Sequence, residues 1–388
     1  MPTTIAHISD THLGKLQYRS RDRRQDYTDA FAEAVDEAIA LDVDAVLHTG
    51  DLFDAPNPNV PVVNQCLDII KKLDAAEIPF LGLVGNHERK RDEQWLDLAK
   101  RFDVVERLSK TPRYIGEGDD AVAVYGIDAV RQPQWNTTDF TLEEPSPDAY
   151  RLLAMHELIS PPVPSHMAHY EAVEILDRVG IRLDGVALGD YHESSRDTVA
   201  GYDTDIWYPG STEKTARDES ATHYFYLLTV ENRDLTITHK QLTSPREFIE
   251  FEIHFQEDDG FEHARRVVEK YNFNGANGKN AVAIAVLHGE NTGVTPQDIH
   301  GLLEKYGAAV TQVVDNRGLI SIDDIDLSSE SMSEMDDLIR ESVADLNLSE
   351  TSEELEALIT DEDVTKTNIR EEGKDILEAA RESRGESQ

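Results

Sequence analysis

The chain has 388 residues, and its 77 acidic against 37 basic residues give a formal net charge of −40 at pH 7. The single cysteine, Cys66, excludes a disulfide framework within the chain, which fits a reducing compartment. No apolar run approaches the roughly 18 residues of a membrane span, and the first residues lack the basic and apolar stretches of a signal peptide, so we expect a cytoplasmic protein outside the membrane.

Five short apolar runs, separated by helical patterns, occupy the first 190 residues. Residues 26–42 and 60–77 place apolar side chains on one helical face, which predicts two helices between the first three runs. This strand–helix–strand alternation is typical of parallel strands covered by helices. Residues 131–149 are predicted to form a long surface loop. The five predicted strands are residues 3–9, 44–50, 79–85, 151–155 and 185–189.

The pattern changes after about residue 215. Residues 224–231 and 235–242 predict a β-hairpin, and strand patterns at 247–255 and 280–288 combine with two helix patterns into a small α+β unit. The last residues form two acidic helix patterns with narrow apolar stripes that neither helix could bury alone. We therefore predict three parts, which are residues 1–245, 246–325 and 326–388.

Each of the five predicted strands ends in side chains that can bind a metal ion. The carboxyl ends of strands in an α/β sheet are where binding sites assemble, so these side chains are expected to converge. Mixed oxygen and nitrogen donors suit Mn²⁺, Fe²⁺ or Zn²⁺. Any one pair could instead be a turn-forming sequence, but donors at every strand end favour a metal site. The donors are Asp10, His12, Asp51, Asn86, His87, His156, Asp190 and His192.

These residues lie in motifs that resemble a known series. DTH (10–12), GDLFD (50–54), GNHE (85–88), MHE (155–157) and GDYH (189–192) resemble the motifs of calcineurin-like metallophosphoesterases. More narrowly, ISDTHLG, TGDLFD, GNHE and YPGSTEKT resemble the double-strand-break-repair nucleases of the meiotic-recombination-eleven type, called SbcD in bacteria. The resemblance is strong over about the first 220 residues. It implies an α/β fold, a β-sandwich flanked by helices, with a small α+β capping domain and a helical acidic tail.

The resemblance also implies a site for two metal ions, which together support in-line phosphoryl displacement. His87 would face the substrate, where it could stabilise the charged transition state or protonate the leaving 3′ oxygen. The family commonly has Gly-His-x-His where this chain has GDYH, and the added charge of Asp190 favours Mn²⁺ and can slow the reaction. The implied ligands are Asp10, His12 and His192 for the first ion, Asn86, His156 and Asp190 for the second, and Asp51 as the bridge.

We interpret the chain as a nuclease that processes DNA ends in double-strand break repair. It is expected to bind two Mn²⁺ per subunit and to act as a 3′-to-5′ exonuclease on double strands and an endonuclease on single strands. One alternative is a phosphoesterase of the same fold with a small substrate, such as a cyclic nucleotide or a phosphomonoester. Another is a scaffold with weak or no nuclease activity, which would agree with the presence of Asp190 where the family commonly has histidine.

DNA binding needs positive charge, and two basic clusters flank the predicted metal loops of this acidic chain. We expect them to contact the phosphodiester backbone of DNA without sequence preference. They could instead begin a solvated helix or pair with acidic neighbours. The clusters are Lys15, Arg19, Arg21, Arg23 and Arg24, and then Arg89, Lys90 and Arg91.

The sequence contains no P-loop motif, so the resemblance implies that ATP enters through a partner, a coiled-coil ABC-type ATPase called SbcC in bacteria. The apolar stripes of the tail could dock on that partner, stay disordered, or fold back on the chain's own core. The resemblance further implies a homodimer through helices near residues 60–76 and 93–102, and a location at the nucleoid. The stripe residues are Leu338, Ile339, Val343, Leu346, Leu355, Leu358 and Ile359.

Negative charge is spread over the whole chain. Residues 323–388 hold 22 acidic and 6 basic residues, net −16, which leaves a net charge of −24 for residues 1–322. A strongly acidic surface keeps a protein hydrated and soluble where salt screens repulsion. Adaptation to high salt, as in a halophilic archaeon, therefore explains the charge, and a dedicated acidic interaction surface is a compatible alternative.

Overall fold

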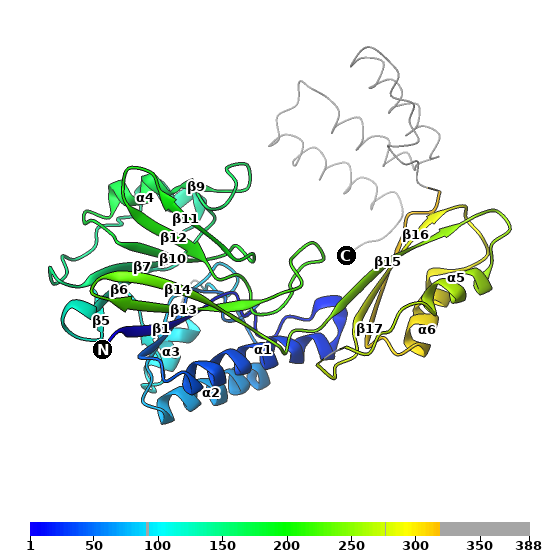
Figure 1. The fold of residues 1–388 in the computed structure, drawn as a ribbon, viewed down its shortest axis with the longest axis horizontal. Coiled ribbons are helices and arrows are strands. Elements are labelled where there is room, and N and C mark those ends of the chain that lie inside the picture. The colour runs from blue at the N-terminus through cyan, green and yellow to red at the C-terminus, as the bar shows by residue number, and fades with distance from the viewer. Residues whose placement is uncertain (91–92, 276, 319–388) are drawn as a thin grey trace, which may run out of the picture. The chain divides into compact units, whose positions relative to one another are not determined.

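The structure, a computed structural model, describes residues 1–90, 93–275 and 277–318 (Figure 1). The chain divides into two compact units, Met1–Asp315 and Asn316–Gln388. Among the described residues, no helix is both long and apolar enough to cross a membrane. Several predicted residues lie outside the described ranges, namely Arg91 and the tail residues Leu338, Ile339, Val343, Leu346, Leu355, Leu358 and Ile359.

The first unit contains a six-stranded sheet whose central strands are parallel. Strand β1 pairs in parallel with β2, which is followed by β3 and β4, so the predicted parallel arrangement is confirmed. On its other side β1 pairs antiparallel with β13, and β13 forms the predicted hairpin with β14. In sheet order the strands are β14 (Asp234–Gln241), β13 (Tyr224–Glu231), β1 (Thr3–Ile8), β2 (Ala45–His48), β3 (Phe80–Gly82) and β4 (Glu106–Arg107).

A second six-stranded sheet has four parallel strands and two antiparallel edges. Strands β12, β10, β7 and β6 are parallel, and β11 and β5 close the two edges. A small parallel pair, β8 (Ile159–Ser160) and β9 (Tyr170–Glu171), lies apart from it. In sheet order the strands are β11 (Ser195–Val199), β12 (Thr204–Tyr208), β10 (Gly185–Gly189), β7 (Tyr150–His156), β6 (Val122–Ile127) and β5 (Arg113–Ile115).

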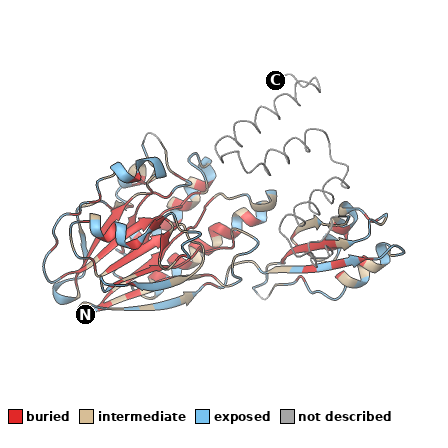
Figure 2. Cartoon of the chain, turned by 90° about the horizontal axis from the view of Figure 1, so that it is seen from above, coloured by how far each residue is buried: buried red, intermediate tan, exposed pale blue. Residues whose placement is uncertain are grey.

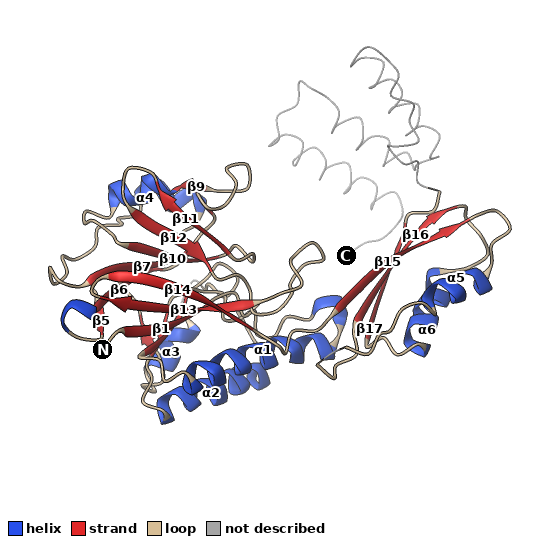
Figure 3. Ribbon diagram, viewed as in Figure 1, coloured by secondary structure: helices blue, strands red, loops and turns tan. Residues whose placement is uncertain are grey.

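The two sheets form a sandwich with helices on its outer faces (Figures 1 and 3). Strand residues alternate between two buried faces: in β2, Leu47 joins the core shared by both sheets, whereas Val46 joins the core under the helices. Strands buried on both faces read as continuous apolar runs, which is why the sequence shows no polar alternation there (Figure 2). The helices are α1 (Arg21–Ala40), α2 (Val60–Ala75) and α3 (Trp95–Lys100) on the first sheet, and α4 (Ala172–Arg178) on the second.

Residues 131–149 were expected to form a surface loop, and that expectation is only partly right. The segment contains no strand or α-helix, but the short helix η3 (Gln132–Thr137) carries Trp135, which is buried together with Phe140. The Trp135 ring stacks on Tyr170 with ring centroids 3.4 Å apart, and the Arg178 guanidinium lies 4.2 Å from the Phe140 ring centroid. The two aromatic side chains anchor the segment to the outer core of the second sheet.

A smaller sheet begins near the predicted boundary at residue 246. Its strands β15 (Phe248–Phe255), β16 (Val282–Gly289) and β17 (Val310–Asp315) are all parallel. Helices α5 (Phe261–Val268) and α6 (Pro296–Lys305) connect them, and the unit has an apolar core of its own. The predicted strands and helices are therefore present, in a repeated β–α–β arrangement that the sequence pattern had not specified. The domain boundaries themselves stay predictions.

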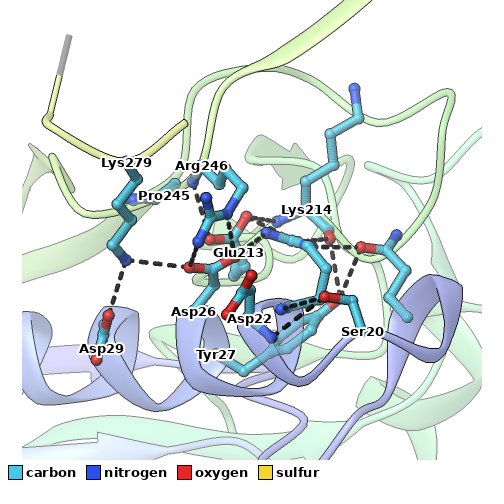
Figure 4. A network of polar contacts seen from close by, with 12 residues as sticks. Ser20, Asp22, Asp26, Tyr27, Asp29, Glu213, Lys214, Pro245, Arg246 and Lys279 are labelled. Atoms are coloured by element: carbon cyan, nitrogen blue, oxygen red, sulfur yellow. Dashed lines mark hydrogen bonds and ion pairs between the residues drawn. The ribbon is translucent and has the colours of Figure 1, made fainter. Parts of the chain in front are cut away.

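A buried ionic cluster joins α1 to the segment that leads into the three-stranded sheet (Figure 4). The Arg246 guanidinium donates to both Asp26 carboxylate oxygens, at 2.6 and 2.9 Å, and Lys279 Nζ lies 3.2 Å from Asp26. Arg23 pairs with Asp26 at 2.8 Å and with Glu213 at 3.1 Å, and all three of these side chains are at most 1% exposed. Buried charges need such pairing, because removing one partner of a buried pair costs roughly 3–5 kcal/mol.

Two buried histidines, His7 in β1 and His48 in β2, lie within the strands of the first sheet. Trp207 Nε1–H donates to His7 Nδ1 at 3.0 Å, and His7 Nε2 lies 2.9 Å from Thr49 Oγ1. Because the indole N–H can only donate, the His7 ring is neutral with its proton on Nε2. Burial, with a contribution from His48, lowers the pKa of His7 to about 3, and burial together with His156 lowers that of His48 to about 3.

The free energy of unfolding is therefore expected to decrease as the pH is lowered below about 6.5. The unfolded chain binds a proton at His7 near pH 6.5, but the folded chain does so only near pH 3, so stability rises with pH across this window. Each such histidine contributes up to about 1.4 kcal/mol per pH unit. We expect His7→Gln to reduce the slope of stability against pH by about that amount in chemical denaturation. Exposed His166→Gln is the matched control, and equal slopes in the two variants would contradict the prediction.

Candidate metal centre

His156, the last residue of β7, and the loops that follow β1, β2, β3 and β10 supply all seven predicted metal ligands. Each of these seven residues lies 3.8 Å or less from another, so that the contacts form one continuous series. The sequence had separated them by up to 182 positions, and the parallel strands bring them together at one edge of the two sheets. In order of contact they are Asn86, Asp190, His156, Asp51, His12, His192 and Asp10.

One side of the centre is formed by Asp51, His156, Asp190 and Asn86. His156 Nε2 lies 3.3 Å from Asp51 Oδ2 and 3.6 Å from Asp190 Oδ1. The other ring nitrogen of His156, Nδ1, lies 2.8 Å from the Thr49 carbonyl oxygen. Because that carbonyl can only accept, Nδ1 carries the proton and Nε2 can present a lone pair. Asn86 Nδ2 donates to Asp190 Oδ1 at 2.7 Å.

The other side is formed by Asp10, His12 and His192, with Asp51 between the two sides. The Nε2 atoms of His12 and His192 lie 3.1 Å apart, and His12 Nε2 is 3.8 Å from Asp51 Oδ2. His192 Nε2 is 3.8 Å from Asp10 Oδ1. Both Asp10 oxygens accept from the backbone N–H of Asp190 at 3.2 Å, which ties this side to the first.

The donor set fits a pair of divalent cations. Among the described residues, Asp51 Oδ2 and His156 Nε2 are buried without a hydrogen-bond partner, although they face each other. Buried polar atoms are normally satisfied, so an unpartnered carboxylate oxygen beside an unpartnered imidazole nitrogen is expected where both bind an ion. Two compact groups of possible ligands share this region, Asp10 with His12 and His192, and Asp10 with Asp51 and His156.

The backbone at four of these ligands is left-handed. The φ angles are 51° at Asp10, 43° at His12, 54° at Asp51 and 89° at Asp190. A non-glycine residue with positive φ costs on the order of 1–3 kcal/mol, and such strain clusters at functional sites. The strained loops turn the side chains inward directly after each strand, which explains how residues two positions apart both reach the centre.

Two glycines leave the room that these ligands need. A Cβ on Gly85 would lie 2.1 Å from Asp51 Oδ1, and a Cβ on Gly50, whose φ is 97°, would lie 2.6 Å from His156 Nδ1. Buried Glu88 then links the two loops, because it accepts from the backbone N–H of Gly85 at 3.2 Å and of Phe53 at 3.1 Å. Burial, with the nearby Asp51 charge, raises the pKa of Glu88 to about 7. The GD and GNHE motifs are thus required by close packing as well as by ligand chemistry.

Charge attraction outweighs burial at Asp51 and His156, whereas burial lowers the pKa of His12 and raises that of Asp190. Burial alone would raise the pKa of Asp51, but His156, His12 and His87 together lower it. Burial would lower the pKa of His156, but the carboxylates of Asp51, Asp190 and Asp10 raise it well above the ordinary value. The carboxylates therefore create a strongly negative cavity that stabilises added positive charge.

The predicted catalytic residue, His87, borders the centre and is 44% exposed. Its backbone N–H donates to Asp51 Oδ1 at 2.9 Å, and its ring lies edge-on to the His12 ring with centroids 4.8 Å apart. Nδ1 lies 3.2 Å from the Asp54 carbonyl oxygen, which can only accept, so Nδ1 carries a proton. The Nε2 atom is the one left to act on a substrate.

Sequence reasoning missed two acidic residues at the site. Asp54 lies 3.4 Å from His12 Nδ1 and forms a third group of possible ligands with His12 and His87. Its position three residues after Asp51, inside GDLFD, was a visible signal. Glu219 contacts His192 Nδ1 at 2.6 Å, and hydrogen bonds from His192 and Thr215 outweigh burial and lower the pKa of Glu219 to about 2. Nothing in the sequence around Glu219 indicated this contact.

The structure places the predicted DNA-binding residues in different surroundings. Arg23 is fully buried and paired with Asp26 and Glu213, so the expectation that it grips DNA is wrong. Lys15 pairs with Asp54 at 3.0 Å. Lys90 Nζ lies 4.8 Å from the Trp95 ring centroid. Of the rest, Arg19 and Arg21 are exposed, Arg24 is half-buried, and Arg89 donates to Ala129 O at 2.7 Å.

A cavity of about 190 Å³ opens beside the Asp190 side of the centre. Its lining includes the predicted ligands Asn86, His156 and Asp190 together with Arg89, Arg131 and His169. Arg131 was not among the predicted DNA contacts, because it is an isolated basic residue in a segment predicted to be a surface loop.

Comparison with known proteins agrees with this geometry. Residues 3–194 match the family model for calcineurin-like phosphoesterase. The DNA double-strand break repair protein Mre11 of Haloferax volcanii is 34% identical over 381 residues, which cover 97% of this chain and 82% of that protein. The chain belongs to the Mre11 family. Its fold class and its predicted family resemblance are both confirmed.

Two further Mre11 proteins match over most of the chain. That of Halobacterium salinarum is 31% identical over 370 residues, covering 95% of this chain and 92% of the relative. That of Methanosarcina acetivorans is 30% identical over 385 residues, covering 96% of this chain and 60% of the relative. As an Mre11-family member with this fold, the chain is a metal-dependent phosphodiesterase of the nuclease type. Two of the three relatives come from halophiles, which fits the acidic composition.

Proposed function

We propose that the chain is a Mn²⁺-dependent DNA nuclease that processes DNA ends in double-strand break repair. The observation that carries this proposal is the convergence of seven oxygen and nitrogen donors, four of them buried, on a strongly negative centre beside exposed His87. Mixed carboxylate, amide and imidazole donors suit Mn²⁺, and the Asp190 carboxylate adds a hard oxygen ligand. The names of the relatives supply the repair context.

In this proposal Asp10, His12 and His192 hold one cation, Asn86, His156 and Asp190 hold the second, and Asp51 bridges them. When bound, the two cations supply Lewis acidity that stabilises both the attacking and the leaving oxygen of an in-line displacement at phosphorus. The protein contributes fixed ligands, four of which are oriented by left-handed backbone. His87 contributes a proton or a positive charge at the leaving 3′ oxygen.

The burial of individual side chains changes the set of residues that we propose to contact DNA. Arg19, Arg21, Arg24, Lys15, Arg89 and Lys90 keep a role as phosphate contacts, whereas Arg23 loses it. Arg131 and His169 line the cavity beside Asp190 and are added to the proposal. These contacts carry no sequence information, which suits an enzyme that acts on DNA ends of any sequence.

The proposal includes a homodimer and an ABC-type ATPase partner. Exposed apolar side chains on and beside these helices support the homodimer, because Val60 at the start of α2 is 71% exposed and Phe102, just beyond α3, is 68% exposed. An apolar hollow between the two helices is lined by Val63, Leu67, Trp95 and Leu98, among others. The proposed contact with the ATPase depends on the tail, which lies outside the described residues.

The test is an assay of the purified chain at high salt. With Mn²⁺ it should degrade end-labelled linear duplex DNA from the 3′ end and cleave circular single-stranded DNA, and chelation should stop both reactions. A cyclic nucleotide and a phosphomonoester serve as the competing substrates. Faster turnover of either small substrate would favour the small-substrate phosphoesterase, and DNA binding without Mn²⁺-dependent cleavage would favour the scaffold.

A further inference from the structure

The ring of His192 is held from outside the predicted ligand set. Its Nδ1 atom lies 2.6 Å from Glu219 Oε1 and 2.7 Å from Thr215 Oγ1. Since a carboxylate only accepts, Nδ1–H donates to Glu219. The proton on Nδ1 leaves Nε2 with a lone pair, and Nε2 is the atom that faces His12 at 3.1 Å and Asp10 at 3.8 Å.

The Glu219 carboxylate is itself fixed in place. Its Oε2 atom accepts from the Thr215 backbone N–H at 2.5 Å, and the Thr215 hydroxyl donates to Oε1. Lys214 Nζ donates to the Glu219 carbonyl oxygen at 2.6 Å. The Glu219 side chain is 9% exposed, so these donors are largely sheltered from competing water. The carboxylate therefore offers His192 one defined direction for its N–H bond.

The segment that carries Thr215 and Glu219 is held to α1 by buried hydrogen bonds. Residues 211–214 are buried, and the Lys214 carbonyl oxygen accepts from Arg23 Nη2 at 2.8 Å and from Tyr27 Oη at 2.9 Å. Arg23 also pairs with Glu213 at 3.1 Å. The buried ionic cluster of α1 thus fixes the backbone from which Thr215 and Glu219 reach His192.

We propose that Glu219 is a positioning residue for His192, which it orients so that Nε2 points into the metal centre. A metal-binding histidine usually donates its other ring N–H to a carboxylate or carbonyl, which sets the tautomer and the ring direction. Thr215 completes the arrangement by donating to the same carboxylate oxygen. This inference rests on the proposed two-ion site and assigns a role to a residue outside its ligand set.

The experiment counts Mn²⁺ ions bound to the full chain by the loss of the six-line electron paramagnetic resonance signal of free Mn²⁺. The wild type should bind two ions. Glu219→Gln keeps the shape of the side chain but removes its charge, and it should weaken one of the two binding steps by about 10–100-fold while the other step stays unchanged. Glu219→Ala should weaken the same step at least as much.

Glu193 provides the matched control. It lies next to His192 in sequence and accepts from the backbone N–H and the hydroxyl of Ser220, both at 2.6 Å, so it ties the same two loops together without touching the His192 ring. Glu193→Gln should bind both ions like the wild type. Equal losses in Glu193→Gln and Glu219→Gln, or no loss in Glu219→Gln, would overturn the inference alone. A wild type that bound fewer than two ions would overturn the proposed site and the inference with it.

Discussion

Asp51→Asn is expected to abolish the nuclease reaction. Asp51 lies between the two halves of the centre, with Oδ2 at 3.3 Å from His156 Nε2 and 3.8 Å from His12 Nε2. The amide keeps the size of the side chain and an oxygen acceptor for the His87 backbone N–H, but it loses the negative charge that a bridge between two cations needs. A loss of about 4 kcal/mol of transition-state stabilisation corresponds to about a 10³-fold fall in kcat/KM.

Two measurements separate this effect from misfolding. The Mn²⁺ count should fall from two ions to one or none, and DNA binding in chelator should stay within a few-fold of the wild type. Asp203→Asn is the control, because Asp203 has the same φ of 54° and a side chain that is 91% exposed. A variant Asp51→Asn that retained both ions and more than about a tenth of wild-type kcat/KM would contradict the bridging role.

The convergence of the proposed ligands could be predicted because the position of each depends on a local pattern. A buried parallel strand leaves an apolar run in the sequence, and the residues directly after it must lie at the carboxyl edge of the sheet. Asp10, Asp51 and His156 each follow such a run, so no knowledge of the distant contacts was needed to place them together. The left-handed backbone at Asp51, in contrast, is marked only by the neighbouring glycine of the GD motif, and that at Asp10, which follows Ser9, left no pattern.

The errors arose where a contact joins distant parts of the chain. Arg23 stands in a basic run and was taken for a surface residue, yet its partner Glu213 lies 190 positions away. Glu219 reaches His192 across 27 positions, inside a segment with no periodic pattern. Trp135 is buried in a segment of mostly polar character. Burial of a single side chain depends on what packs over it, and a local pattern cannot supply that information.

His87→Gln is expected to slow the chemical step without weakening substrate binding. The Nδ1–H bond to the Asp54 carbonyl, at 3.2 Å, orients the ring so that Nε2 is the atom available to the substrate. Glutamine can donate a hydrogen bond but cannot transfer a proton, so kcat should fall by about 10²–10⁴-fold, as for loss of a general acid. The Mn²⁺ count should stay at two, because His87 is not among the proposed ligands.

A change of the leaving group distinguishes between proton transfer by His87 and simple charge stabilisation by His87. A DNA substrate with sulfur in place of the scissile 3′ oxygen expels a thiolate, which needs no proton. If His87 protonates the leaving oxygen, the defect of His87→Gln should shrink on this substrate to less than about 10-fold, because the lost proton transfer no longer limits the rate. If His87 only stabilises negative charge on the phosphoryl oxygens, the defect should be the same on both substrates. Exposed His166→Gln should show no defect on either one, and a kcat unchanged in His87→Gln would remove His87 from the reaction.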